Sequence, residues 1–325
     1  MAIEQTIKKY QGFTLVELIV TMVLMGILFG VISNIVLVPI QGYVQASLHA
    51  NLVDQAESAL RRIERDLARA VPNSIRVKNG GGNGAVEMLN VVEGARYRSQ
   101  PPGTINTTIL DLSVGQVYTD FNILGNFQYA KTSPTGIDYG YRLVIYNTGA
   151  YGATMDNPIA GANVWSTSLA PNLGFPEQNP PAGTSVITLP APAPASPATK
   201  VLLTSPGGAE DHINITPGFQ FAFDSPQKRI YVVDGPISYV WDPVAQTITR
   251  YAGYTIQGVQ PNNGGAAPLS TAASIGLLTQ NVTNCVFNYI PGTAQRNSVL
   301  IISLTISKNG ASVTLLHEVT ASNNP

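Results

Sequence analysis

A long apolar run near the N-terminus dominates the hydrophobic pattern of this chain. It extends from Phe13 to Val38, and Glu17 is its one ionisable side chain. A helix of this length measures about 39 Å, which is enough to cross a bilayer. Lys8 and Lys9 precede the run, and the positive-inside rule keeps such residues in the cytoplasm. We therefore expect residues 13–38 to be a single membrane span with a cytoplasmic N-terminus.

The pattern becomes amphipathic between Ile40 and Ala70. Charged side chains of both signs alternate along one face, while apolar side chains recur every three or four residues at Val44, Leu48, Leu52, Ala56, Leu60, Ile63 and Leu67. This spacing predicts a helix with one buried stripe. Pro72 is expected to end it near Ala70. The two patterns together predict one spine helix over residues 13–71, first in the membrane and then packed against a globular domain.

After Asn73 the helical period gives way to short β-rich runs. The expected strands are Ser74–Lys78, Ala85–Glu93, Ile105–Leu112, Phe121–Ala130, Tyr141–Asn147, Phe219–Phe223, Ile230–Asp234, Ile237–Trp241, Thr247–Tyr251, Cys285–Ile290, Val299–Ser307 and Ser312–Val319. The pair Asn309-Gly310 predicts a type I′ hairpin turn. The glycine-rich stretch 80–84 is expected to form another hairpin or a flexible loop. The predicted fold class is α+β, with a long helix packed on an antiparallel β-rich domain.

Two stretches interrupt the strands of the predicted domain, residues 72–325. Residues 171–200 are rich in proline and are read as an irregular or polyproline-like excursion. Residues 261–273 are rich in Gly, Asn, Ala and Ser and are expected to be a mobile loop. The first stretch either separates two β subdomains, 73–170 and 201–325, or is an insertion in one large domain, which we favour.

Composition narrows the possible functions. Only 11% of the residues are charged and the formal net charge is −1, so no basic field exists to attract nucleic acid. Cys285 is the only cysteine, which excludes an intrachain disulfide. We expect it to be a small buried side chain in a strand.

The sequence offers little catalytic chemistry. The histidines are His49, His212 and His317, and the cluster Glu210-Asp211-His212 lacks the spacing of a zinc site, so a solvated loop is expected there. Nucleophile-elbow, P-loop and dinucleotide motifs are absent. Calcium in an Asn/Asp/Gly loop is conceivable, but no EF-hand ligand series supports it. We expect no enzyme activity and no cofactor. Aromatic residues are expected to pack in the core or, alternatively, to stack on sugars, as at Tyr139, Tyr141, Trp165 and Trp241.

Glu17 helps to distinguish three interpretations of the N-terminal segment: a cleavable signal peptide, a simple membrane anchor and a more specific signal. A cleavable signal peptide would carry a small-residue cleavage site after the apolar run, and none occurs between Val31 and Gly42. A simple anchor leaves the acid unexplained. The stretch Gly12-Phe13-Thr14-Leu15-Val16-Glu17 after a basic leader resembles the cleavage and methylation signal of type IV pilins and type II secretion pseudopilins.

This resemblance implies a set of roles for the N-terminal residues. A prepilin peptidase/methyltransferase would remove the leader, residues 1–12, by cutting between Gly12 and Phe13, and would methylate the new Phe13 amine. Glu17 would meet that amine on a neighbouring subunit during assembly. The implied partners are other major and minor pilins, the inner-membrane assembly platform and the inner membrane. The implied route of the chain is from the inner membrane, with a periplasmic C-terminal domain, to a pilus on the cell surface.

The span also departs from the family pattern. Many members carry a kinking proline about two-thirds of the way along it, where this chain has Ser33-Asn34, and its first proline is Pro39. Any kink or local melting is therefore expected later in the helix. Gly26 and Gly30 form a small-xxx-small spacing that would let another helix approach closely.

Other segments resemble narrower families. Residues 61–70, with an Arg-Asp-Leu-x-x-Ala ending, are similar to the J-type minor pseudopilins. Residues 232–239, 278–285 and 307–317 are similar to the O-type minor pilins of the mannose-sensitive haemagglutinin (MSHA) pilus. The function implied is that of a minor pilin in a type IV adhesion pilus. A type II secretion minor pseudopilin is one alternative, and a pilus-tip adhesin with its own carbohydrate or surface site is another.

Overall fold

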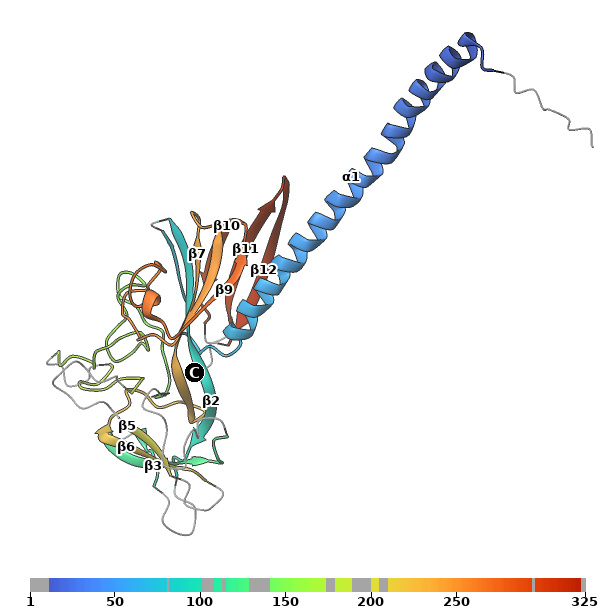
Figure 1. The fold of residues 1–325 in the computed structure, drawn as a ribbon. Coiled ribbons are helices and arrows are strands. Elements are labelled where there is room, and N and C mark those ends of the chain that lie inside the picture. The colour runs from blue at the N-terminus through green and yellow to red at the C-terminus, as the bar shows by residue number, and fades with distance from the viewer. Residues whose placement is uncertain are drawn as a thin grey trace, which may run out of the picture. The chain divides into compact units, whose positions relative to one another are not determined.

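Figure 1 shows the computed structural model of the chain. It describes residues 12–80, 82–100, 108–112, 115–128, 141–173, 179–188, 200–204, 210–293 and 296–322; the side chains of residues 33–39, 41 and 200–204 are also outside the description. The chain separates into two compact units, with the boundary between Asn51 and Leu52. Each unit is described by itself.

The described part of the N-terminal unit, residues 12–51, contains the first part of helix α1. The helix begins at Leu15 and continues without a break to Leu67, over 53 residues. Its window Leu15–Ile32 has a mean hydropathy of 2.6 and is fully exposed, so it is long and apolar enough to cross a membrane. The helical assignment continues through the region where local melting was expected, around Pro39. The apolar run and the amphipathic run are thus parts of one helix.

The end of α1 lies in the C-terminal unit, where the predicted apolar stripe is buried from Leu52 onward; Val44 is exposed and Leu48 is half-buried. The buried stripe consists of Leu52, Ala56, Ala59, Leu60, Ile63 and Leu67. The helix ends three residues before Ala70, the position predicted from Pro72. The backbone there bonds to a strand instead, because Val71 N donates to Leu89 O at 2.9 Å and Val91 N donates to Arg69 O at 2.8 Å. Pairing with a neighbouring strand therefore ends the helix before the proline does.

Two antiparallel sheets form the β-rich part. The larger sheet contains β1 (Arg76–Gly80), β2 (Asn83–Tyr97), β3 (Tyr118–Leu124), β4 (Arg142–Val144), β5 (Lys200–Thr204), β6 (His212–Phe219), β7 (Arg229–Asp242), β8 (Thr247–Ala252) and β9 (Ser274–Gln280). Its order is β5-β6-β3-β2-β7-β8-β9, with β1 beside β2 and β4 beside β7. The smaller sheet has the order β10-β11-β12, formed by Val282–Ile290, Ser298–Lys308 and Ala311–Ala321. The predicted α+β class is confirmed.

Several predicted strands need correction. The separate strands predicted on either side of Gly235 are one strand, β7, which pairs with β2 from Arg229 to Trp241. Gly235 has φ of 137°, a value that glycine tolerates and that keeps the chain in the ladder through a bulge. The strand predicted at 219–223 is wrong, because β6 ends at Phe219. Of the strand predicted at Ile105–Leu112, residues 108–112 form no strand and residues 105–107 lie outside the described residues. Strands β5, β6 and β9 were not predicted.

The predicted Asn309-Gly310 hairpin forms, and of the two alternatives expected for residues 80–84, a hairpin or a flexible loop, the structure has the hairpin. Asn309 and Gly310 have φ of 50° and 81°, as a type I′ turn requires, and Lys308 faces Ala311 across it. The glycine-rich stretch joins β1 to β2, with Gly80 opposite Asn83. Turn chemistry was therefore readable from the sequence at both sites.

The two irregular stretches carry more structure than expected. Residues 261–273 include a 3₁₀ helix at Leu269–Thr271, and Leu269 is fully buried in a cluster with Ala85, Val240, Tyr251 and Tyr254. The prediction of a mobile loop is wrong because this apolar side chain fills the core. In the proline-rich stretch, Val186 and Ile187 are buried in a second cluster, while residues 174–178 and 189–199 lie outside the described residues.

Candidate processing and assembly site

The start of α1 is built by a threonine cap. Glu17 N donates to Thr14 Oγ1 at 3.3 Å, and Leu18 N donates to Thr14 O at 3.2 Å. Two donors of the first turn are thereby satisfied, as at other helix N-termini. The spacing Thr14-x-x-Glu17 is that of a capping box. Sequence reasoning missed the role of Thr14, although this spacing signals it.

Glu17 projects from the first turn of an apolar surface. Its side chain is exposed, and so are the large apolar side chains of Leu15, Val16 and Leu18. An acid in the first turn is favoured by the helix dipole, which reduces but does not remove the cost of placing it in hydrocarbon. Among the described residues, no cation forms an ion pair with this carboxylate. The assembly role of Glu17 stays a prediction, because it needs a second subunit.

The predicted cleavage point lies just before the helix. Gly12, Phe13 and Thr14 have no regular secondary structure, and Phe13 is 79% exposed. No heavy atom comes within 4 Å of the place where a Cβ on Gly12 would stand. The peptide bond between Gly12 and Phe13 is thus accessible in an irregular segment. Its cleavage stays a prediction, as does the methylation of Phe13.

Gly26 and Gly30 lie one turn apart on α1. A Cβ added at either position would meet no heavy atom within 4 Å. Residues four apart share one face of a helix, so the two glycines leave a shallow strip on the exposed apolar surface. Their role in helix packing stays a prediction, because it needs a second helix.

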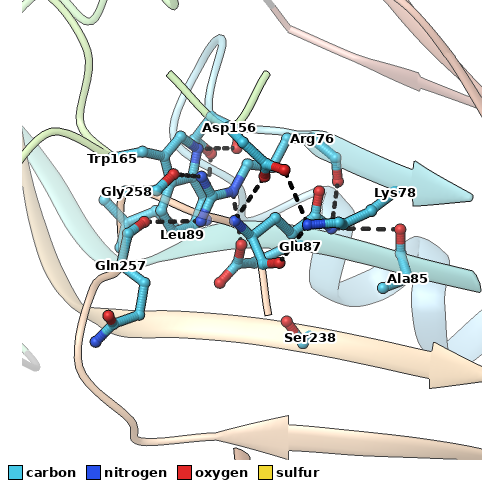
Figure 2. Close-up of polar contacts among 12 residues, drawn as sticks. Arg76, Lys78, Ala85, Glu87, Leu89, Asp156, Trp165, Ser238, Gln257 and Gly258 are labelled. Carbon is cyan, nitrogen blue, oxygen red and sulfur yellow. Dashed lines mark hydrogen bonds and ion pairs between the residues drawn. The ribbon is translucent and has the colours of Figure 1, made fainter. Parts of the chain in front are cut away.

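The C-terminal unit contains a very different charged site. Arg76 on β1 and Glu87 on β2 are both completely buried, and Arg76 Nε lies 2.6 Å from Glu87 Oε2. Tyr254 donates its hydroxyl to Glu87 Oε1 at 2.7 Å. Arg76 also donates to the carbonyl oxygens of Gly258 at 2.6 Å and Gln257 at 2.8 Å. Figure 2 shows Arg76 and Glu87 on their two strands, with Gln257 and Gly258 beside the Arg76 side chain.

The surroundings of this pair give it a structural role. The guanidinium carbon of Arg76 lies 4.1 Å from the centre of the Trp165 ring, and Trp165 Nε1 donates to Ser74 O at 2.8 Å. Burial raises the pKa of Glu87, and Arg76 and Tyr254 oppose that shift. The network connects the β1–β2 hairpin to loops far along the sequence. Trp165 is buried within it, so the alternative that Trp165 stacks on sugars is wrong and the core reading is correct.

The acidic cluster near β6 also differs from the prediction. Asp211 is completely buried and accepts a hydrogen bond from Phe127 N at 2.8 Å. Glu210 forms an ion pair with Arg98. The predicted solvated loop is wrong, because the loop supplies partners to β3 and its neighbours.

His212 belongs to the same cluster. Its Nε2 lies 3.3 Å from Asp120 Oδ2, and its Nδ1 lies 2.7 Å from Asn122 Oδ1. Within the described part of the chain, no group of three His, Cys, Asp or Glu side chains could hold a metal ion. The contacts of His212 are those of a structural side chain.

The remaining sequence candidates have ordinary positions. His49 is exposed and Tyr141 is half-buried. Trp241 is half-buried and donates to Val282 O at 3.2 Å. His317 Nε2 lies 3.1 Å from Glu64 Oε2. Tyr139 lies outside the described residues.

Cys285 matches its prediction. The side chain is buried in β10. Burial raises the pKa of its thiol to about 12, so the protein keeps it as an uncharged, unreactive group.

One comparison with known proteins is positive. Residues 7–33 match the family model of the prokaryotic N-terminal methylation motif. This motif indicates a type IV pilin-like prepilin, a structural class that a prepilin peptidase processes and that assembles with other pilins. The apolar helix and the motif fit a single-pass, membrane-anchored protein. No curated protein and no solved structure matches the chain.

Proposed function

We propose that this chain is a minor pilin, assembled into or priming a type IV adhesion pilus of the MSHA kind. The prepilin would be cut between Gly12 and Phe13, methylated at Phe13, and held in the inner membrane by residues 13–38 until assembly. The observation that carries the proposal is the methylation motif at residues 7–33, which leads directly into an exposed apolar helix with one acid. The narrower MSHA assignment rests on the sequence similarity of residues 232–239, 278–285 and 307–317.

The chemistry of Glu17 supports an assembly role. Cleavage would create an α-amine at Phe13, four residues before Glu17. Within one chain, the Thr14 cap leaves the carboxylate facing outward. On a neighbouring helix that is axially shifted, a Phe13 amine would supply the missing cation. Pairing would offset the desolvation of both charges in an apolar bundle.

The globular unit favours a minor position in the filament. Residues 52–325 include long connections between strands in addition to the two sheets. Bulky loops would hinder uniform stacking along a shaft, whereas a subunit at the tip has no neighbour on one side. This supports priming or capping as the specific role.

The decisive variant is Glu17→Val. We expect the chain to stay in the membrane at its normal level and to fall at least ~10-fold in sheared filaments, because the loss of a paired buried charge costs about 1.4 kcal/mol or more. Quantitative immunoblots of membrane and filament fractions measure both amounts. Normal incorporation of Glu17→Val would refute an assembly role for the acid.

The matched control is Glu57→Val. Glu57 lies on the same helix but outside the span, where it is exposed and pairs with Arg61. It should enter filaments normally. Mass spectrometry of the wild-type chain should also find a methylated Phe13 at the mature N-terminus, and an intact leader would contradict the processing step.

Two alternative functions can be distinguished by related measurements. A type II secretion minor pseudopilin would be found in a secretion pseudopilus and its loss would block protein export, with piliation unchanged. A tip adhesin would lose attachment but retain piliation after a surface aromatic is changed. Trp165 is not a candidate for such a surface aromatic because it is buried, and Tyr141 and Trp241 are only half-exposed.

A further inference from the structure

Two adjoining hollows lie where β2 passes β7, beside the end of helix α1. The larger has a volume of about 810 Å³ and the smaller has a volume of about 370 Å³. Asp234 lines both hollows, and we call the two together the Asp234 groove. All of its lining residues belong to the C-terminal unit. Both volumes are in the range of pockets that hold small ligands.

Bulges in the two strands shape the larger hollow. The ladder between β2 and β7 passes over Val92 on the first strand and Asp234 on the second, so neither residue has a partner in it. Both line the hollow. Bulges redirect side chains and are frequent next to functional sites. The chain just after α1 forms another wall, because Val91 N donates to Arg69 O at 2.8 Å.

Arginine side chains give the larger hollow its positive charge. Arg69 and Arg229 both line it. In the described part of the chain, no acid forms an ion pair with Arg69. Arg229 lies directly opposite Arg96 in the β2–β7 ladder, and like charges in opposite positions destabilise a sheet. A bound anion would offset this repulsion.

The smaller hollow has a cation of its own. Arg142 lines it, is half-buried, and donates from Nη1 to Thr188 O at 3.2 Å. No acid of the described ranges forms an ion pair with this guanidinium. Burial lowers its pKa to about 10, so Arg142 still carries its charge at neutral pH. A partly buried cation without a counter-charge is costly, and a bound anion would remove that cost.

Groups that suit sugar rings lie beside these cations. Asn90 Nδ2 donates to Asp234 Oδ1 at 2.9 Å, and a carboxylate has room to accept further hydrogen bonds from ligand hydroxyls. Tyr231 is half-buried and its ring lies over Gly94, where an added Cβ would stand 3.3 Å from Tyr231 Cδ1. An aromatic ring of this kind packs against the apolar face of a sugar. The acid in the wall disfavours a ligand that is only an anion, because the two charges would repel.

We propose that the Asp234 groove binds an acidic saccharide, a sugar chain that carries carboxylate groups. Its carboxylates would pair with Arg69, Arg229 and Arg142, since guanidinium and carboxylate groups form paired hydrogen bonds. Its hydroxyls would donate to Asp234, and one sugar ring would lie against Tyr231. The inference goes beyond the proposed assembly function, because it gives the globular unit a ligand of its own.

Saturation-transfer NMR of the full-length chain in detergent tests the class of ligand. The acidic probes are trigalacturonate and sialyllactose, and their neutral counterparts are fully methyl-esterified trigalacturonate and lactose. We expect at least one acidic probe to bind, and its neutral counterpart to bind ~10-fold or more weakly. Binding of neither acidic probe, or equal binding of the acidic and neutral forms, would overturn the proposal.

Inorganic phosphate separates a saccharide site from a simple anion site. Phosphate lacks the sugar rings and is repelled by Asp234, so its displacement of the bound acidic probe should need a concentration ~10-fold or more above that of the probe. Displacement at equal concentrations would reduce the groove to an anion site and overturn the saccharide assignment.

Arg69→Gln is the primary variant, because this side chain is exposed and its loss should leave the fold intact. It should weaken binding of the acidic probe ~10-fold, and Arg142→Gln should do the same from the smaller hollow. The matched control is Arg61→Gln, which removes a positive charge from α1 outside the groove, where Arg61 pairs with Glu57. It should bind like the wild type. Circular dichroism checks the fold, and wild-type affinity in either folded groove variant would overturn the proposal; if Arg142→Gln misfolds, Arg69→Gln decides.

The two proposals fail in different experiments. Saccharide binding is measured on the purified chain and needs no filament, so Glu17→Val should bind the acidic probe like the wild type. If the chain is not a pilus subunit, it will be absent from filaments and still bind the probe. If the groove is assigned wrongly, the probe will not bind, and Glu17→Val will still be lost from filaments.

Discussion

Two carboxylates in apolar surroundings, Glu17 and Glu87, have opposite arrangements of partners. Glu87 is completely buried and receives its ion pair and hydrogen bond from Arg76 and Tyr254 of the same chain. Glu17 lies on an exposed apolar helix, with only its backbone N–H engaged by Thr14. A buried charge is retained only when it is paired. Folding provides the partners of Glu87, whereas no cation among the described residues forms an ion pair with Glu17.

The difference teaches where to look for function in a chain without catalytic groups. The Arg76–Glu87 pair is completely buried, and its members connect segments that are distant in sequence (Figure 2). The Glu17 turn is open, apolar and next to the predicted cleavage point. An acid in a membrane-length helix is the informative feature, because a charge in hydrocarbon is costly and therefore indicates a functional position.

The largest expected effect on stability comes from removing the cation of the closed pair. Arg76→Met should lower the free energy of unfolding by about 3–5 kcal/mol, because Glu87 would be left buried without its counter-charge. The double variant Arg76→Met with Glu87→Met should recover part of this loss, since no charge is then buried. Chemical denaturation of full-length chains in detergent measures both. Equal stability of Arg76→Met and wild type would contradict the assignment of the pair as a structural element.

A smaller effect concerns a buried ionisable group without a charged partner. The pKa of the Cys285 thiol is raised to about 12 from an ordinary value of 9.0. The folded state therefore keeps this proton through a pH range in which the unfolded chain loses it, and its contribution to stability is present below pH 9 and lost as the pH rises toward 12. At pH 9, alkylation of Cys285 should be ~10-fold or more slower in the native chain than in denaturant. Equal rates would show that the thiol is accessible.

The smallest effect is expected where both charges are exposed. Arg61 Nη2 and Glu57 Oε1 lie 2.5 Å apart on one face of α1, one turn from each other. Replacing the acid in Glu57→Gln should change stability by only about 0.3–0.5 kcal/mol, because water screens the pair. The same unfolding assay measures it. A loss of stability as large as that of Arg76→Met would contradict the expected difference between buried and exposed ion pairs.

Much of the fold was readable from local patterns. The uniform apolar run, the amphipathic stripe and the turn residues each impose a period or a backbone conformation on adjacent residues, so α1 and the Asn309-Gly310 hairpin could be predicted. The motif around Glu17 was readable for the same reason, since all its residues lie within two helical turns. Its unrecognised part, the Thr14 cap, was also a local signal.

Other features depended on segments that meet only in the folded chain. The sequence did not show that β7 passes through Gly235, because pairing with β2 holds that residue in the ladder. Leu269 lies in a stretch that reads as a loop, and Glu210 and Asp211 in one that reads as solvated, but distant partners bury or engage them. Likewise, Arg76 and Glu87 are near neighbours across a hairpin, while the Trp165 ring and the carbonyls of Gln257 and Gly258 come from far along the chain.

The sequence by itself determined the membrane-length helix, its acid and the processing motif, because these are properties of consecutive residues. Only the tertiary structure decided which charged side chains are buried with their partners, which aromatic rings are buried and which strands lie at the edge of a sheet. Those properties depend on what covers a residue, and the covering groups are distant in sequence. Glu17 is exposed on the apolar surface of α1, where the described part of the fold supplies no such cover.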